Sequence, residues 1–242
     1  MKKNVLVTGA SRGIGRAIAL AFAEAGWSVG ICCRTNEDRL LEVKKEIEQH
    51  GVSCFAFLGD LSDYETAHRF VTKSREVLGP IDCLVNNAGI SIIGLLTDLT
   101  PEEWQKIIGT NLSSVYNCCH PVIPDMVSRQ SGSIINISSV WGICGASCEV
   151  AYSASKGGIN AFTRALAKEL APSHISVNAI ACGAIDTEMN QFLDADERQA
   201  LIDEIPACRL GRPEEVGKLA LSLAGSNPYL TGQVITLDGA WI

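Results

Sequence analysis

Short apolar runs alternate with longer amphipathic segments along most of the chain. The runs are rich in Val, Ile, Leu and Cys, and their lengths are typical of strands buried in a parallel sheet. We predict such strands at residues 5–8, 28–33, 52–58, from 83, at 133–138, 175–181 and 233–237.

Between these runs, apolar residues recur every three or four positions, which predicts helices that bury one face. The expected helices cover residues 14–25, 37–50, 62–77, 100–129, a segment through 152–156 that ends near 170, and a last one from 213. Ser62 is a candidate N-cap for the third helix. We expect a break in the fourth helix near Pro121 and Pro124.

The alternation of strand and helix predicts an α/β fold, a doubly wound parallel sheet with helices on both faces. No repeat, low-complexity tract or linker divides residues 1–242, so we expect one domain. Residues 186–212 are more polar and less periodic, and we interpret them as a lid-like segment over a substrate.

Composition and charge narrow the class of protein. Hydrophobic residues make up 47% and charged residues 19% of the chain, as in compact domains, and the formal net charge is −7. With no basic tract, we expect neither nucleic acid nor an anionic membrane as a partner. Lys2 and Lys3 precede an apolar run too short for a signal peptide, and no run is long enough to span a membrane. We therefore expect a cytoplasmic protein.

Ten cysteines are present, but their spacing indicates neither disulfides nor a metal site. Two pairs are directly adjacent, no C-x-x-C occurs, and only four histidines are available as further ligands. We expect buried, reduced thiols and no bound metal.

A glycine-rich turn, T-G-x-x-x-G-x-G at residues 8–15, links the first predicted strand to the first helix. Glycines at this place permit a tight turn and let the backbone approach a pyrophosphate at the helix N-terminus. Strand-to-helix turns also need glycine for purely structural reasons, but the place within a β-α-β unit favours a dinucleotide.

Tyr152 and Lys156 lie four residues apart, so both project from the same face of a helix. An ammonium beside the phenol is expected to lower its pKa towards neutral, which would make Tyr152 an acid. Most pairs with this spacing are ordinary surface neighbours. Ser139, thirteen residues upstream, adds a hydroxyl that is able to bind the same substrate.

The glycine turn, the N-N-A-G at residues 86–89, Asn111, Ser139 and the Y-x-x-x-K at 152–156 together resemble the short-chain dehydrogenase/reductase family. The resemblance runs from end to end of the chain. It implies a Rossmann sheet of about seven strands, a bound nicotinamide dinucleotide, and hydride transfer between a carbonyl and an alcohol carbon.

The resemblance also implies catalytic roles. Tyr152 would donate the proton, Ser139 would bind the substrate oxygen, and Lys156 would tune the tyrosine and bind the nicotinamide ribose. Asn111 would hold a water that links Lys156 to solvent. Two structural alternatives stay open: Ser139 as a cap of its strand, and Asn111 as a turn or helix-interior residue.

For the cofactor, the second strand ends at Arg34, where a site for NAD would place a carboxylate. With Arg12 in the glycine turn, this favours NADP(H), although Arg34 could be a solvated loop charge. By resemblance, Asp60 and Leu61 would line the adenine. The remaining implied cofactor contacts are Gly9, Ser11, Gly13, Ile14, Gly15, Asn87, Ala88, Gly89, Gly183, Ile185 and Thr187, with Tyr152 and Lys156.

Within the family, the chain is most similar to the 3-oxoacyl-[acyl-carrier-protein] reductases of fatty acid biosynthesis. Members of the family are mostly tetramers, so the resemblance implies a homotetramer. The carrier-docking cations of that group are only partly matched, by Arg129 but by no cation near Ser173 and His174. Cys182 also stands where the family usually has proline, which would loosen the turn before Gly183.

Trp141 and Glu149 lie between Ser139 and Tyr152 and are expected beside the substrate. This stretch is similar to reductases of a 5-aminopentanone group on elongation factor P, and Glu149 would attract a cationic amine. Alternatively, Glu149 is only an exposed acid favoured by the helix dipole. A third reading, from another class, is a non-catalytic NADP-binding sensor; the intact Ser139, Tyr152 and Lys156 argue against it.

Overall fold

A single parallel sheet organises the fold. The computed structural model describes residues 3–190, 193–225, 227 and 229–242. Seven parallel strands run in the order β3-β2-β1-β4-β5-β6-β7. They are β1 (Asn4–Thr8), β2 (Ser28–Cys33), β3 (Cys54–Leu58), β4 (Cys83–Asn86), β5 (Gly132–Ser139), β6 (Ile175–Cys182) and β7 (Val234–Leu237). The predicted doubly wound sheet is confirmed.

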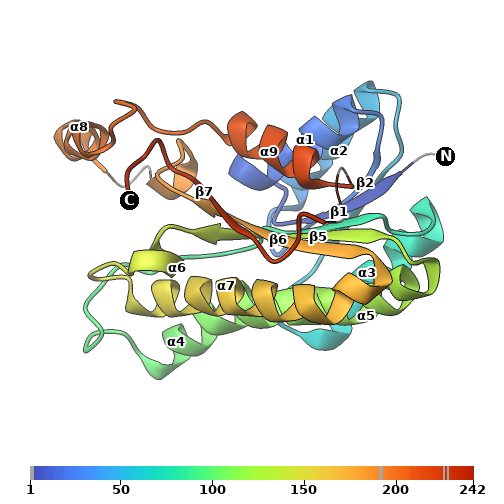
Figure 1. The fold of residues 1–242 in the computed structure, drawn as a ribbon. Coiled ribbons are helices and arrows are strands. Elements are labelled where there is room, and N and C mark those ends of the chain that lie inside the picture. The colour runs from blue at the N-terminus through green and yellow to red at the C-terminus, as the bar shows by residue number, and fades with distance from the viewer. Residues whose placement is uncertain (1–2, 191–192, 226, 228) are drawn as a thin grey trace.

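Helices cover both faces of the sheet (Figure 1). One face carries α1 (Gly13–Glu24), α2 (Glu37–Gln49) and α9 (Pro213–Leu223). The other carries α3 (Tyr64–Leu78), α5 (Ser114–Arg129) and α7 (Val150–Leu170). The shorter helices are α4 (Pro101–Ile108), α6 (Trp141–Cys144) and α8 (Ala195–Glu204).

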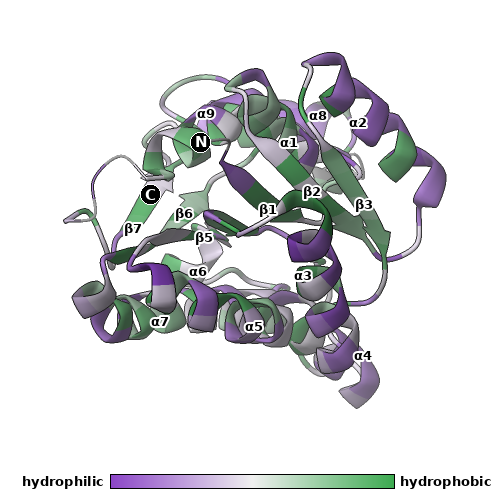
Figure 2. Ribbon diagram, turned by 90° about the vertical axis from the view of Figure 1, so that its right-hand side faces the viewer, coloured by the Kyte–Doolittle hydropathy of each residue, from purple (hydrophilic) through white to green (hydrophobic). Residues whose placement is uncertain are grey.

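Each face of the sheet buries its own hydrophobic core. Side chains alternate along a strand, so Val5 and Val7 of β1 enter the core under α1 and α2, whereas Leu6 enters the core under α3 and α5. Figure 2 shows the consequence: the strands are hydrophobic, and polar residues cover the outer surfaces of α2 and α3. The continuous apolar runs of the sequence are therefore strands covered on both sides.

The predicted helix break near Pro121 and Pro124 is wrong. Both prolines lie inside α5, and Pro124 and His120, four residues before it, are both exposed, on the side of the helix where water is able to replace a hydrogen bond that proline does not donate. The break lies earlier, in a π-helical turn at Gly109–Ser113 between α4 and α5.

One further expectation needs correction. Ser62 does not cap α3: Asp63 is the N-cap, and its carboxylate accepts a hydrogen bond from the Thr66 N–H. The polar segment at 186–212 contains α8, which begins with a capping box between Asp194 and Glu197, and its role as a lid stays a prediction. Within the described ranges, no helix is long and apolar enough to cross a membrane.

The packing of α9 on α1 gives a test of the fold. A Cβ atom added to Gly217 would lie 2.8 Å from the Ala17 carbonyl oxygen, which is backbone and cannot yield. We expect Gly217→Ala to lower the free energy of unfolding by about 1–3 kcal/mol, measured by urea denaturation.

Gly157→Ala, on α7, is the control. Its Cβ would lie 3.6 Å from the Gly142 carbonyl oxygen, an ordinary contact. We expect this change to be neutral or stabilising by up to about 1 kcal/mol, since alanine favours helices. Equal losses in the two variants would contradict close packing of α9 on α1.

Candidate active site

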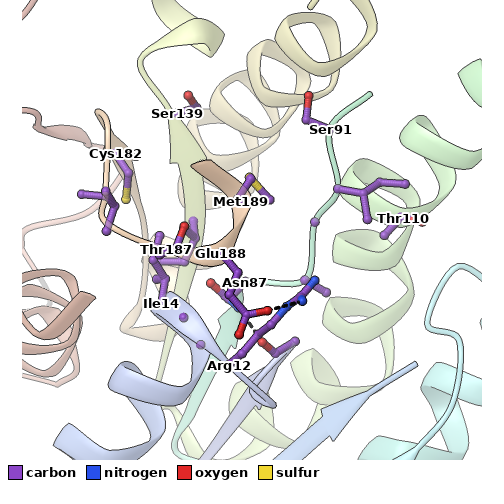
Figure 3. Close-up of a pocket in the computed structure, with 18 of the residues that line it drawn as sticks. Arg12, Ile14, Asn87, Ser91, Thr110, Ser139, Cys182, Thr187, Glu188 and Met189 are labelled. Atoms are coloured by element: carbon purple, nitrogen blue, oxygen red, sulfur yellow. Dashed lines mark hydrogen bonds and ion pairs between the residues drawn. The ribbon is translucent and has the colours of Figure 1, made fainter. Parts of the chain in front are cut away.

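A cavity of about 950 Å³ opens along the carboxyl ends of the strands (Figure 3). The turns that follow β1, β2, β3, β4 and β6 line it, together with the end of β5 and the start of α7. Open α/β sheets bind their ligands at this edge. Of the residues predicted to form the site, all line the cavity except Asn111, which is buried behind it.

The glycine turn owes its shape to close contact with the turn after β4. The Asn87 Nδ2 donates to the carbonyl oxygens of Thr8, at 2.9 Å, and Gly9, at 3.1 Å. A Cβ atom on Gly15 would lie 2.3 Å from the Gly9 oxygen and 2.4 Å from the Asn87 Nδ2, so no larger residue fits there. Gly9 has a φ of 64°, in the region that favours glycine.

The N-terminus of α1 has the features of an anion site. Arg12 is its N-cap residue, and its side chain does not cap the helix. The first-turn residues Gly13 and Ile14 line the cavity, so their backbone N–H groups and the helix dipole are available to a diphosphate. This donor set fits the dinucleotide implied by the sequence.

Three arginines gather at the same end of the cavity. Arg12 and Arg34 were predicted there, and the structure adds Arg39, from the first turn of α2. The Arg34 Nη1 lies 3.8 Å from the Asp60 Oδ2. Glu188 forms ion pairs with the other two: its Oε2 lies 2.6 Å from the Arg12 Nη1, and its Oε1 lies 2.7 Å from the Arg39 Nη1. Hydrogen bonds from these two guanidinium groups hold the pKa of Glu188 below its ordinary value, and the bond from Arg39 has the larger effect.

At the other end, β5 and α7 bring the predicted catalytic side chains together. Lys156 is only 4% exposed, and its Nζ donates to the Ile137 carbonyl oxygen at 2.8 Å. That nitrogen lies 5.5 Å from the centroid of the Tyr152 ring. Ser139 is hydrogen-bonded to Tyr152, and its Oγ accepts the Trp141 N–H at 3.2 Å. Because the Trp141 N–H is the donor in that bond, the Ser139 proton remains available to another acceptor.

The pKa of Tyr152 departs from the expectation. Burial raises the pKa of this phenol, and the charges of Cys182 and Glu149 add to the rise, whereas the hydrogen bond with Ser139 lowers it. Lys156 was predicted to lower it, but its ammonium is directed at the Ile137 carbonyl group, and burial lowers the pKa of Lys156 to about 8. The predicted lowering is therefore wrong for the protein as described.

Asn111 is fully buried in the π-helical turn and binds protein groups. Its Oδ1 accepts the Ile90 N–H at 2.8 Å, and its Nδ2 donates to the Ile90 oxygen at 2.9 Å and to the Ser155 Oγ at 3.0 Å. The Ser155 hydroxyl in turn donates to the Tyr152 carbonyl oxygen at 2.7 Å. Asn111 thus links the loop after β4 to the helix that carries Tyr152, and its role towards water stays a prediction.

Aromatic rings and a carboxylate line the part of the cavity predicted to face the substrate. Trp141 packs edge-on against Trp241, with ring centroids 4.9 Å apart, and both line the cavity. Glu149 accepts a hydrogen bond from the Ser91 hydroxyl and makes no cap bond to α7, of which it is the N-cap residue. Ser91 and Trp241 were not predicted as site residues, because only the fold brings them near Glu149 and Trp141.

The turn after β6 is held in place without the usual proline. The Gly183 N–H donates to the Leu237 carbonyl oxygen at 3.0 Å, and a Cβ on Gly183 would lie 2.6 Å from the Cβ of Asp238. Cys182 is buried, and burial raises the pKa of its thiol to about 12. Across the described residues, no group of three or more His, Cys, Asp or Glu side chains is placed to hold a metal ion.

Comparison with known proteins agrees with this architecture. The model of the short chain dehydrogenase family matches residues 3–198. The uncharacterized oxidoreductase YmfI of Bacillus subtilis is 40% identical over 244 residues, which span 100% of this chain and 99% of that protein. The 3-oxoacyl-[acyl-carrier-protein] reductase FabG of Staphylococcus aureus is 38% identical, over 99% of this chain and 98% of that one.

A solved structure also matches over nearly the whole chain. The 3-oxoacyl-[acyl-carrier protein] reductase of Brucella melitensis superposes with a TM-score of 0.93 at 34% identity, covering 99% of this chain and 91% of that one. The chain therefore belongs to the short-chain dehydrogenase family and is an oxidoreductase of that family. Within it, the chain is similar to the 3-oxoacyl-[acyl-carrier-protein] reductases.

Burial of Lys156 gives a test by pH. An unfolded lysine titrates near 10.4, so a folded pKa of about 8 means that the charged form destabilises the fold by about 3 kcal/mol below pH 8. This cost disappears as the pH rises from 8 to above 10.4. We expect Lys156→Met to raise the melting temperature at pH 7, and the gain to shrink over that range.

Lys168→Met is the control, because Lys168 is exposed on the same helix. Its melting temperature should follow that of the unchanged protein at every pH from 7 to 10.5. A gain in Lys156→Met that stays constant over this range would show that the Lys156 ammonium is not the destabilising group.

Proposed function

We propose that the protein reduces a ketone with a hydride from NADPH. The observation that carries this proposal is the hydrogen-bonded pair of Tyr152 and Ser139 beside buried Lys156, at one end of a cavity whose other end holds three arginines. A proton donor and a nucleotide-sized anion site in one cavity are the two requirements of nicotinamide-dependent carbonyl reduction.

The cofactor, when bound, supplies the hydride to the carbonyl carbon. As the carbonyl oxygen gains negative charge, Ser139 donates a hydrogen bond to it, and Tyr152 transfers its phenolic proton to give the alcohol. The raised pKa of Tyr152 keeps the phenol protonated at neutral pH, as a proton donor must be. Lys156 would stabilise the phenolate that remains only if its ammonium turned from the Ile137 carbonyl oxygen towards the phenolic oxygen.

Residues along the cavity would hold the cofactor. The glycine turn and the start of α1 would bind the diphosphate, and Asp60 and Leu61 would line the adenine. Arg12, Arg34 and Arg39 would bind the 2′-phosphate, because guanidinium groups match a phosphate dianion in charge and geometry. This is the reason to propose NADPH rather than NADH.

The relatives named as 3-oxoacyl-[acyl-carrier-protein] reductases favour a 3-oxoacyl ketone as the substrate. Docking of an acidic acyl carrier protein on this chain has less support than the 3-oxoacyl substrate. Arg129, the one predicted docking cation, is bound to Asp82 and Asp125, each at 3.0 Å, and only 27% of its side chain is exposed. We therefore propose the 3-oxoacyl group as substrate and leave the carrier to experiment.

A second candidate substrate is a ketone that carries a cationic amine, such as the 5-aminopentanone group on elongation factor P. Glu149 supplies a carboxylate inside the cavity, and Trp141 and Trp241 supply aromatic faces that attract cations. This proposal concerns the substrate alone, and the roles of Ser139, Tyr152 and Lys156 are the same.

Tyr152→Phe tests the reaction. With NADPH and an acetoacetyl ester, we expect the rate of NADPH oxidation to fall by about 10²–10⁴-fold, since the variant has no proton to donate. Tyr116→Phe, at an exposed tyrosine on α5, should leave the rate unchanged. If the unchanged protein shows no turnover and binds NADPH with the same affinity as Tyr152→Phe, the protein is a sensor rather than an enzyme.

Glu149→Gln tests the substrate class. Glutamine keeps the acceptor for Ser91 but removes the charge. We expect kcat/KM for an aminoketone to fall about tenfold, or about 1.4 kcal/mol, while that for a neutral ketone of the same length stays unchanged. Glu102→Gln, at an exposed acid on α4, is the control. Parallel changes for both ketones would exclude recognition of the amine by Glu149.

A further inference from the structure

A carboxylate of the protein itself occupies the arginine end of the cavity. Glu188 lies in the segment after β6, far along the chain from its partners in the glycine turn and in α2. Its Oε2 lies 2.6 Å from the Arg12 Nη1, and its two oxygens receive the Arg39 Nη1 at 2.7 and 2.9 Å. Figure 3 shows Glu188 reaching across the cavity to Arg12.

The charges at this end suggest what the carboxylate replaces. Five charged residues line it: Arg12, Arg34, Arg39, Asp60 and Glu188. Three cations minus two carboxylates leave a surplus of one positive charge. Without Glu188 the surplus is two, which matches the charge of a phosphate monoester dianion. Glu188 therefore occupies the place of an anion that the arginines would otherwise take up.

Glu188 is also coupled to the rest of the cavity through its neighbours. The segment leaves a fixed point, where the Asp186 N–H donates to the Gly211 carbonyl oxygen at 2.8 Å. The next three residues, Thr187, Glu188 and Met189, all line the cavity. The ion pairs of Glu188 are thus a contact that ties this short stretch, with Thr187 and Met189, to the arginine end of the cavity.

We propose that Glu188 is an internal competitor for the phosphate site: a phosphate monoester displaces its carboxylate from Arg12 and Arg39, and the displacement repositions residues 187–189. This inference rests on the proposed function, because the 2′-phosphate of NADPH is the monoester concerned. NADH lacks that phosphate and leaves Glu188 on its arginines. Glu188 thus sets the affinity for NADPH without contributing to that for NADH.

Binding of the two dinucleotides to Glu188→Gln, followed by their fluorescence, tests the competition. Without the competing charge, the Kd of NADPH should fall about three- to tenfold, and that of NADH should change less than twofold. Asp196→Asn removes one charge from α8, in the same segment but outside the cavity lining, and should alter neither Kd by twofold.

The methyl NMR signals of Thr187 and Met189 test the displacement. Adenosine 2′,5′-bisphosphate carries the phosphate without a nicotinamide, and AMP lacks the 2′-phosphate. In the unchanged protein, the bisphosphate should shift both methyl signals, and AMP should not. In Glu188→Gln, both signals should lie at shifted positions without any nucleotide.

The outcomes separate the two proposals. If the unchanged protein prefers NADPH over NADH but Glu188→Gln has the same Kd for NADPH, the competition by Glu188 is wrong. The same holds if the bisphosphate binds and the methyl signals of Thr187 and Met189 do not move. If the unchanged protein binds NADPH no more tightly than NADH and does not bind the bisphosphate, the arginines are not a phosphate site, and both proposals fail.

Discussion

The buried ammonium of Lys156 is the constraint around which the catalytic end is built. A charge removed from water costs several kcal/mol unless polar groups surround it, and here the Ile137 carbonyl oxygen at 2.8 Å provides the hydrogen bond. Gly142 makes room for the Lys156 backbone, because a Cβ on Gly142 would lie 2.6 Å from the Lys156 carbonyl carbon. Gly89 lies beside the ammonium, since a Cβ there would be in ordinary contact with the Nζ, at 3.5 Å. Residues of β5, of the loop after β4 and of α6 thus surround one buried charge. Burial of a charge destabilises the fold, and such a cost is typical of a functional site.

The two ends of the cavity have different electrostatics, and this gives it a direction. At the dinucleotide end the charge is positive and exposed, so the side chains of Arg12 and Arg39 keep 62% and 44% of their surface. At the other end Lys156 is enclosed, and the charge of Glu149 helps to raise the pKa of Tyr152. An exposed cluster suits a ligand that must bind and leave, whereas an enclosed one suits proton transfer to a forming alkoxide.

Much of this architecture is predictable from the sequence, for a physical reason. The strands are covered on both faces, so their apolar runs stand out, and residues 28–33 were placed without error. Motifs close in sequence, such as Tyr152 and Lys156 on α7, were likewise predictable because one helix turn sets their geometry. The carboxyl ends of parallel strands lie at the same edge of a sheet, so Ser139 and the glycine turn were expected at one edge.

What the sequence did not predict depends on burial or on long-range contacts. The direction of the Tyr152 pKa shift is set by desolvation, which no spacing reveals. The break before α5 occurs at Gly109–Ser113, where the buried Asn111 fixes the loop after β4, rather than at the two prolines. Arg39 pairs with Glu188 across 149 residues, and only the fold brings them together.

The identity of the ketone depends on the part of the cavity that family membership constrains least. In the proposed reaction, proton delivery would need Ser139, Tyr152 and Lys156, whatever lies beyond the carbonyl carbon. The far side of the substrate would meet Trp141, Trp241 and Glu149, which line the same cavity. An aromatic wall accepts an acyl chain or a cation equally well, but a carboxylate does not, because a neutral chain leaves its charge without a partner. Glu149 already has Ser91 as a donor, which reduces that penalty and leaves room for both substrates. Discrimination between them therefore rests on a single charge at the start of α7.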